Sequence, residues 1–491
     1  MIVHYGIQWI NGEDFDYSRP FFEQFHEILL AAPHPARVTF GENQNSEYCN
    51  YNFGFKDSYL CFSGDKVDSC LYSYASGSIS KCIESAYSMH CECCYRVVRC
   101  KYCFDCFFAF DCERCTSSMF LSDCLGCQSC YQCVGLRHKS FHIRNEDCGS
   151  KTEYERRLAE IRPSTQSEFL SAERQFEEFI LHFPVKSFHQ VSCEDCVGHE
   201  VHNSKNCFQC FTVVGDDNRD CAYCAVGGQQ MFRCYDTYGT GCDVKSGLEL
   251  SEVGLSSQDV AFCIKVENSS EVYYSHSCYS SNHLFGCFGL KHQSYCILNK
   301  KYSEAEYYNQ LRKIVPHMKG TKEWGEFFDL KHSLFGYNET AAQTHFPISE
   351  LVAREKGLRW SLYENILAEP QEVLPNNILP DTWADISDTL AGKTVICRTT
   401  KKPFRITALE CKLHKGFKLP IPLQHPEIRL ERLMKYRQPY FLYQINCIKC
   451  NSDTLSVYPQ DFKRPVVCPS CYKYLDSAEY LSELKNGAVA Q

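Results

Sequence analysis

The sequence lacks the short motifs that mark most nucleotide-binding and hydrolytic enzymes. It contains no G-x-x-x-x-G-K-[ST] loop, no G-x-G-x-x-G turn after a strand, no H-E-x-x-H pair and no G-x-S-x-G elbow. With 35 cysteines and 18 histidines among 491 residues, some Cys–His proximity is expected by chance, and no pair stands out as nucleophile and base. We therefore expect no catalytic residues and favour a non-enzymatic protein; an enzyme of undefined reaction is an open alternative.

An export signal and a membrane span are also missing. Residues 1–18 lack the basic-then-apolar build of a signal peptide, and the sequence has no apolar run of 18 residues. We therefore expect a cytoplasmic protein with no membrane partner, in which the thiols stay reduced. Metal binding or burial would then account for the cysteines, and a secreted, disulfide-linked protein is the alternative.

Charge is unevenly distributed along the chain. The formal net charge is −9, yet residues 391–475 hold sixteen Lys and Arg against five Asp and Glu. A basic end joined to an acidic remainder predicts that an anionic partner meets only that end.

Cysteine, by contrast, is abundant and regularly spaced. Between residues 49 and 133, fifteen of the sixteen cysteines fall in one register of three. A first column repeats every 21 residues and a second keeps the same step with an offset of twelve: Cys49, Cys70, Cys91, Cys112, Cys133; and Cys61, Cys82, Cys103, Cys124. We interpret the 21-residue period as the repeating coil of a β-helix-like solenoid. A spacing of three differs from the two-residue alternation of strands, so we expect some sides to be extended corners.

A second copy of this pattern follows the first. The segment 133–145, which begins Cys-Val-Gly-Leu, returns at 287–299 as Cys-Phe-Gly-Leu, and each copy precedes a helix with a capping serine, Ser150 or Ser303. The two helices are expected to stop at Pro163 and Pro316. This internal duplication predicts two solenoids and the following organisation: N-terminal helical cap 1–45, first solenoid 46–150, helical cap and bridge 151–190, second solenoid 191–302, helical cap 303–345, linker region 346–390, and basic zinc-ribbon domain 391–491.

The N-terminal cap rests on one amphipathic helix. Ser18 and Pro20 precede apolar residues at helical spacing, from Phe21 to Leu29. We expect this helix to cover the open end of the first solenoid, because a terminal coil has no neighbour. An ordinary amphipathic helix that packs elsewhere is the alternative.

The strongest metal motif is near the C-terminus. The pattern C-x2-C…C-x2-C, formed by Cys447, Cys450, Cys468 and Cys471, matches a zinc ribbon in which four thiolates close a structural Zn2+ site. The first ladder contains similar spacings, as in Cys91/Cys94 with Cys112/Cys115. For these cysteines, which we call the ladder cysteines, we favour burial in columns of small residues inside the solenoid. Metal binding by the ladder cysteines is the alternative.

Basic residues interleave with apolar and aromatic ones between residues 393 and 437. Beside a zinc ribbon, such a pattern is typical of a surface for phosphates and exposed bases. A solvated basic face, or one docked on the acidic solenoid, is the alternative. The candidate nucleic-acid-binding residues are Lys401, Lys402, Arg405, Arg429, Arg432, Lys435 and Arg437.

The chain resembles two groups of proteins. Residues 397–429, with Cys397, Thr400, His425 and Ile428 at the four ligand positions, resemble a degenerate zinc-ribbon motif of the form CxxCGKxF…E…PxxCxxCR. Residues 16–25, 45–51 and the Gly-Leu closures resemble cysteine-rich repeat proteins with zinc-ribbon domains that are common in candidate-phyla bacteria. The second resemblance implies an architecture and no activity.

The prediction is thus a mainly β protein with two tandem cysteine-ladder solenoids, helical caps and a C-terminal zinc ribbon. We expect a zinc-binding protein that binds nucleic acid, RNA first, or a nucleic-acid assembly through its basic end. A protein–protein interaction scaffold that uses the solenoid surface is the alternative.

Overall fold

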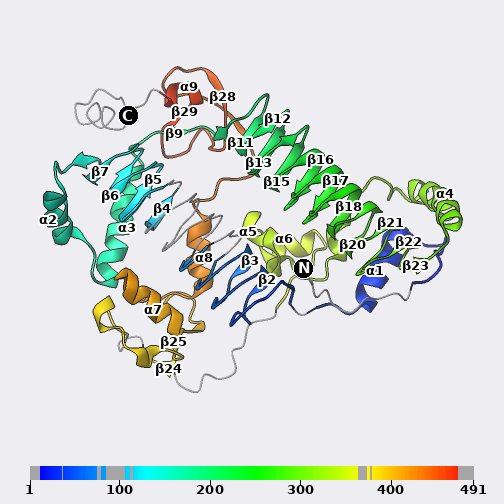
Figure 1. Cartoon of the computed structure of the whole chain (residues 1–491), viewed down its shortest axis with the longest axis horizontal. Helices are drawn as coiled ribbons and strands as arrows, with labels where there is room; N and C mark the ends of the chain where they lie inside the picture. The colour runs from blue at the N-terminus through cyan, green and yellow to red at the C-terminus, as the bar shows by residue number, and fades with distance from the viewer. Residues whose placement is uncertain are drawn as a thin grey trace.

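The structure is a computed structural model and describes residues 12–35, 37–73, 79–84, 106–110, 114–362, 373–375 and 379–473. The protein is mainly β, with 32% of its residues in strands and 24% in helices, as predicted. Two groups of parallel strands dominate the molecule, and helices lie at their ends and along their sides (Figure 1).

The first group, which we call the first stack, comprises residues 39–84 and 106–147. Its strands pair parallel and in chain order within two sheets, except for the last pair, which is antiparallel. The strands are β1 (Thr39–Phe40), β2 (Asn50–Phe53), β3 (Phe62–Asp65), β4 (Cys106–Phe110), β5 (Ser118–Ser122), β6 (Gln128–Val134), β7 (Ser140–Ile143) and β8 (Glu146–Asp147).

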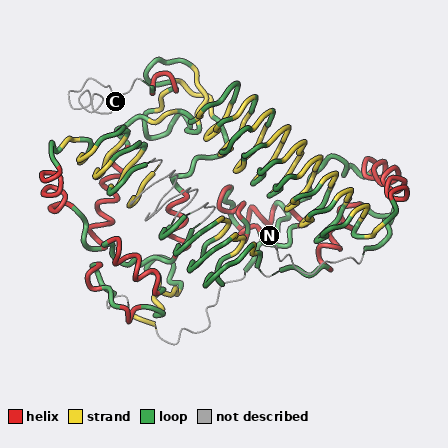
Figure 2. The backbone as a smooth tube through the Cα atoms, in the orientation of Figure 1, coloured by secondary structure: helices red, strands yellow, loops and turns green. Residues whose placement is uncertain are grey.

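The second stack comprises residues 190–301 and forms one 14-stranded sheet. Its strands lie side by side along a row (Figure 2), and several neighbours in the row are not consecutive strands of the chain. The strands are β10 (Gln190–Val191), β11 (Val197–His202), β12 (Ser204–Lys205), β13 (Phe208–Val213), β14 (Asn218–Arg219), β15 (Ala222–Gly227), β16 (Met231–Tyr238), β17 (Val244–Ser251), β18 (Ser257–Glu267), β19 (Ser270–Tyr273), β20 (His276–Tyr279), β21 (Asn282–Phe285), β22 (Ser294–Ile297) and β23 (Lys300–Lys301).

The step from one layer to the next in the first stack is twelve residues, so the 21-residue coil is wrong. Tyr59 pairs with Leu71, and Leu71 pairs with Ile83. A 21-residue cysteine period arises because one layer of twelve and a further nine residues lead to another inward position. In the second stack the step lengthens: Phe208 pairs with Ala222, fourteen residues on. There Cys242, which continues the 21-residue column, is exposed.

Every third residue of the first stack turns the chain. From residue 51 to residue 72, each third position has a φ between 46° and 64°, in the left-handed region: Tyr51, Gly54, Asp57, Leu60, Ser63, Lys66, Ser69 and Tyr72. Two extended residues and one left-handed residue form a unit of three, and four units make one layer of twelve. The three-residue spacing thus corresponds to short extended segments that are separated by left-handed residues.

One side chain of each unit points inward and also caps the backbone. The Cys70 N–H donates to Ser58 Oγ at 3.2 Å, and twelve residues later the Cys82 N–H donates to Cys70 Sγ at 3.4 Å. The inward thiols in turn face carbonyl oxygens; Cys61 Sγ lies 3.4 Å from the Cys70 oxygen. Either cysteine or serine can therefore occupy such an inward position, because both side chains are small and can donate and accept hydrogen bonds.

A helix follows the last strand of each stack. The helices α2 (Lys151–Ile161) and α4 (Glu304–Gly320) lie at opposite ends of the molecule (Figure 1). As predicted, the Ser150 and Ser303 side chains cap them by accepting from the N–H groups of Glu153 and Glu306. α2 ends before Pro163 as predicted, whereas α4 continues through Pro316, so that predicted stop is wrong.

The N-terminal helix α1 (Phe21–Ala31) covers the second stack, so its predicted place on the first is wrong. Phe21 and Phe25 are buried with Phe285 and Tyr307, near the end of the second stack. Ser18 does not cap α1; the carboxylate of Glu323 accepts from the Phe21 and Phe22 N–H groups at 2.9 and 2.7 Å. The alternative, a helix packed elsewhere, holds.

The C-terminal region packs against the first stack. A side of that stack rich in large apolar residues, including Phe120, is covered by α3 (Gln166–Ile180) and by residues of α7 and α8, such as Phe417 and Leu433. The remaining elements are β9 (Val185–Lys186), α5 (Ala341–His345), α6 (Glu350–Glu355), β24 (Val373–Leu374), β25 (Thr394–Ile396), β26 (Pro403–Arg405), α7 (Ala408–Phe417), α8 (Pro426–Met434), β27 (Tyr443–Asn446), β28 (Asp453–Ser456), β29 (Val466–Val467) and α9 (Pro469–Tyr472).

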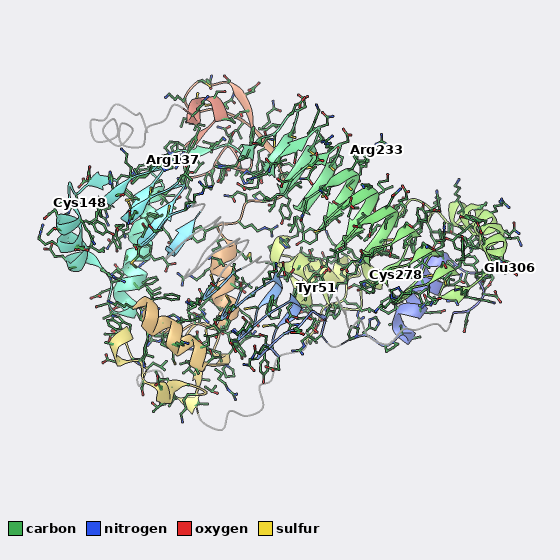
Figure 3. The ribbon with its side chains drawn as sticks, in the orientation of Figure 1. Tyr51, Arg137, Cys148, Arg233, Cys278 and Glu306 are labelled. Carbon is green, nitrogen blue, oxygen red and sulfur yellow. The ribbon has the colours of Figure 1, made fainter. Side chains whose placement is uncertain are left out.

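The two stacks contact each other along their sides. Tyr51, on the first stack, faces the second (Figure 3), and the Lys265 ammonium lies 4.6 Å from the centre of its ring. Glu252 lies 3.7 Å from the same ammonium. Burial raises the pKa of the Tyr51 phenol, and the carboxylates of Glu252 and Glu267 raise it further.

Candidate metal centre and the basic C-terminal segment

Four cysteines near the C-terminus converge, as the spacing predicts. The sulfurs of Cys447, Cys450, Cys468 and Cys471 all lie within 4.8 Å of one another, and the Cys450 and Cys468 sulfurs are 3.9 Å apart. Among the residues that the structure describes, no other group of three or more Cys, His, Asp or Glu comes this close.

Two tight turns bring these sulfurs together. The first follows β27, where the Cys447 N–H donates to the Ser452 oxygen at 2.9 Å and Asn451 adopts a left-handed φ of 54°. The second opens α9: Cys468 is the N-cap, and Pro469 fixes the first helical φ. Backbone N–H groups also point at sulfur, since the Cys468 N–H donates to Cys447 Sγ at 3.2 Å.

These donors favour thiolates. The pKa of Cys450 is lowered to about 6, chiefly by the Ser452 hydroxyl and N–H. Burial raises the pKa of Cys447, but the N–H groups of Cys468 and Cys450 lower it by more. The pKa of Cys471 is raised to about 12, first by its hydrogen bond with Cys450. A divalent cation would replace the remaining protons, because thiolates are its ligands.

The chemistry of such a site is structural. Four sulfurs complete a tetrahedral shell and leave no position for water or substrate. The residues present therefore fit a closed metal site, and the reactions that an open metal site supports are not expected here.

The cluster ties the C-terminus to the middle of the chain. β29, which directly precedes Cys468, pairs in parallel with β9. Ile445 and Val466 pack on Val185, and the Arg464 side chain donates to the Phe183 oxygen at 3.1 Å. A metal at the cluster would thus stabilise contacts between the ribbon and the segment that joins the two stacks.

Three of the predicted nucleic-acid-binding residues lie together and are exposed. Lys401 and Lys402 precede β26 and Arg405 ends it. Lys402 also lies 3.1 Å from the Glu427 carboxylate, an exposed pair that contributes little to stability.

Arg429 is not a surface residue, so its predicted contact with nucleic acid is wrong. It is 2% exposed, and its guanidinium lies 2.7 Å from Glu84 and 3.3 Å from Glu410. The guanidinium also covers the Tyr72 ring at 4.4 Å. Burial raises the pKa of Glu410, while Arg429 opposes this rise.

The other three predicted residues lie in and after α8. Arg432 is partly buried against α3, where it lies 2.7 Å from the buried carboxylate of Glu173. Lys435 is exposed, and the Arg437 guanidinium lies 4.2 Å from the centre of the Tyr440 ring. Of the seven predicted residues, Lys401, Lys402, Arg405 and Lys435 are exposed, and Arg437 is partly buried.

Sequence reasoning missed the acidic partners of α8. Glu84 lies 345 positions before Arg429, and no spacing in the sequence connects them. Glu173 lies on α3 among residues whose pattern indicates only an amphipathic helix. The one signal available in the sequence was the position of Glu173 on an otherwise apolar helix face, which indicates a basic partner without identifying it.

The ladder cysteines do not form a comparable centre where the structure describes them. Cys124, Cys127, Cys130 and Cys133 are buried, and their sulfurs contact backbone carbonyls at 3.3–3.7 Å. The proposed grouping of Cys91 and Cys94 with Cys112 lies outside the described residues. For the described ladder, buried columns fit better than metal.

Residues 397–429, which resemble a degenerate zinc-ribbon motif in sequence, do not gather a set of metal ligands. Cys397 is buried beside β25, and the Thr400 N–H donates to its sulfur at 3.4 Å. His425 is partly buried, and burial lowers its pKa. Thr400 and Ile428 supply no thiolate, so this segment offers one thiolate and one imidazole.

Comparisons with known proteins identify no family. No protein-family model matches the sequence, and no curated protein matches it. Among solved structures, a Desulfovibrio desulfuricans G20 protein to which acetyltransferase activity has been attributed is 8% identical, over 59% of this chain and 79% of that one, with a TM-score of 0.11. A TM-score this low carries no argument about fold or function. Within the described residues, no helix is both long and apolar enough to cross a membrane.

Proposed function

We propose that the protein binds one structural Zn2+ through Cys447, Cys450, Cys468 and Cys471. The observation that carries this is the approach of all four sulfurs to within 4.8 Å. Zinc suits an all-thiolate site of this spacing, because Zn2+ binds four thiolates in a tetrahedral arrangement and has no redox chemistry. Reduced thiols fit a cytoplasmic location.

For the scaffold, we propose two tandem solenoids related by duplication. Parallel strand pairing in both stacks, a step of twelve residues in the first and of up to fourteen in the second, and columns of buried cysteines support this architecture. The scaffold would relate the chain to the cysteine-rich repeat proteins that its sequence resembles.

The function that we propose is binding of single-stranded nucleic acid, RNA first, by the basic C-terminal segment. Support comes from the charge of residues 391–475 and from the exposed cluster of Lys401, Lys402 and Arg405. The binding surface is smaller than the sequence predicts, because Arg429 and Arg432 are engaged with carboxylates. The zinc site would act indirectly by holding the end of this region against β9, in the segment that joins the two stacks.

Filter binding to single-stranded RNA by the full chain tests this function. The full chain is needed, since α8 and β29 are packed against other parts of the protein. If about five basic side chains contact phosphates, log K should fall against log salt with a slope of roughly −3.5. Binding should weaken equally for all sequences when Lys401, Lys402 and Arg405 are changed to Glu, because phosphate contacts carry no base information.

The matched control changes Lys205, Arg219 and Arg233 of the second stack to Glu, which alters the net charge equally. This variant should bind RNA within twofold of the wild type. No binding at about 50 mM salt, where charges are least screened, would reject the proposal. If both triple variants lost RNA affinity equally, the binding would be a nonspecific effect of net charge and not a property of the proposed surface.

A further inference from the structure

One outer side of the second stack carries a continuous column of mainly apolar residues. Strand pairing aligns the same position of successive layers, and alanine is the smallest residue that it places there. The column reads Phe208, Ala222, Tyr235, Leu248, Ala261, Tyr273, Phe285 and Ile297.

The later half of this side is covered by the protein itself. Phe21 and Phe25 of α1 lie in one core with Phe285 and with Phe262 and Tyr274, which follow Ala261 and Tyr273. Phe21 stacks edge-on against Phe285 with ring centres 5.3 Å apart.

Among the residues that the structure describes, none covers the earlier half in this way, and its large side chains are exposed. Its large residues are Phe208 (46% exposed), Tyr223 (51%), Tyr235 (42%) and Leu248 (40%). We call these four residues the open face.

Carboxylates border the open face. Asp236 and Glu249 directly follow Tyr235 and Leu248, and Glu326 approaches Glu249 from the segment after α4. Burial raises the pKa of Glu249, and the charges of Asp236 and Glu326 raise it further. A cation placed here would relieve this repulsion between like charges.

We propose that the open face binds a basic amphipathic α-helix of a partner protein. The argument is continuity: α1 already lies on the same column, with aromatic residues four apart. The four layers of the open face extend about 15 Å at roughly 4.8 Å per strand, which is the length of about ten helical residues. Lys or Arg beside the apolar positions would pair with Asp236, Glu249 and Glu326.

Two other occupants fit less well. Nucleic acid would bring phosphates against the bordering carboxylates, and the nearby Arg219 and Lys245 are already paired with Asp217 and Asp243. A second copy of the chain would place the acidic borders of two open faces against each other. The inference is independent of the proposed RNA binding, which uses the other end of the chain.

A labelled peptide tests the proposal with the full chain. The probe is residues 18–35 carrying Glu23→Lys and Glu27→Lys, and binding is followed by fluorescence anisotropy. We expect saturable binding that weakens at least tenfold in the Tyr235→Ser/Leu248→Ser variant. Leu255→Ser, at an exposed leucine outside the open face, should bind as the wild type does.

Charge reversal separates this site from nonspecific hydrophobic binding. The Asp236→Lys/Glu249→Lys variant should prefer the unmodified Glu23/Glu27 peptide over the lysine probe. Absence of binding, or equal binding by the Tyr235→Ser/Leu248→Ser variant, would overturn the proposal. So would a concentration-dependent dimer that this variant abolishes, because the open face would then be covered by a second copy.

Discussion

The same local motif, C-x2-C, takes two forms in this molecule. In the second stack, Cys207 and Cys210 are buried one unit of three apart, and each sulfur contacts backbone carbonyls. In the C-terminal ribbon, Cys447 and Cys450 belong to one turn and face Cys468 and Cys471. The C-x2-C spacing alone is therefore a poor guide to metal binding in this chain.

The backbone explains this difference. In the stacks, a left-handed residue turns the chain between consecutive inward positions, and the N–H of one layer is capped by the side chain of the layer before it. In the C-terminal cluster, the Cys471 N–H donates to the sulfur of Cys468 in the same turn, and the Cys468 N–H donates to the sulfur of Cys447 in the other turn. The stacks bury their thiols against backbone carbonyls, whereas the turns of the C-terminal cluster gather four sulfurs and direct N–H donors at them.

The largest expected contrast is in the ribbon. Cys447→Ser or Cys471→Ser should abolish zinc binding and unfold residues 443–472, because structural zinc contributes roughly 10–16 kcal/mol to such small domains. Zinc content and hydrogen exchange would measure this. Cys263→Ser, in the second stack, should retain the full zinc content, and a loss there would break the distinction between the two forms.

Replacing a cysteine of the second stack by aspartate should lower the stability much more at an inward position than at an outward one. Cys263 is 0% exposed, so Cys263→Asp should cost several kcal/mol and lower the thermal midpoint strongly. Cys242→Asp is the control, because Cys242 is exposed. Equal midpoints for the two variants would contradict the inward placement of Cys263.

Removing the buried guanidinium should be nearly as costly. Arg429→Met would leave Glu84 and Glu410 buried without their cation, at a cost of about 3–5 kcal/mol in a denaturant melt. Arg398→Met, at an exposed arginine, should change stability by less than about 0.5 kcal/mol. Full stability of Arg429→Met together with weakened RNA binding would restore Arg429 as a surface contact.

The smallest expected effect concerns Cys70 of the first stack, whose sulfur both fills space and accepts a hydrogen bond from the backbone. Cys70→Ala removes the sulfur that accepts from the Cys82 N–H and should cost about 1–2 kcal/mol. Cys70→Ser should cost less, because Ser58 makes the same bond one layer earlier. If the alanine variant proves the more stable of the two, the sulfur is not needed as an acceptor.

Local signals in the sequence predicted the mainly β fold, the serine caps of α2 and α4, and the gathering of four ribbon cysteines. These features depend on residues close in the chain or on a fixed spacing. The length of a layer was predicted wrongly. When every third residue points inward, a step of 21 residues and a step of twelve residues both lead from one inward position to another. The structure resolves this through strand pairing, which composition does not encode.

Long-range packing was not predictable from one sequence. The pattern of α1 indicates an apolar helix face, but nothing in this pattern indicates which of the two stacks the helix covers. Arg429 stands in a basic segment and resembles its exposed neighbours, whereas its partner Glu84 lies in a distant layer. Pairings of this kind depend on how separate parts of the chain come together, and no local period records them.

The most direct test of the two forms of cysteine is the number of zinc ions bound by the full chain under reducing conditions. Native mass spectrometry should give one zinc per chain, and none after Cys447→Ser. Three or more zinc ions would contradict the account, because the ladder cysteines would then have to bind metal as well.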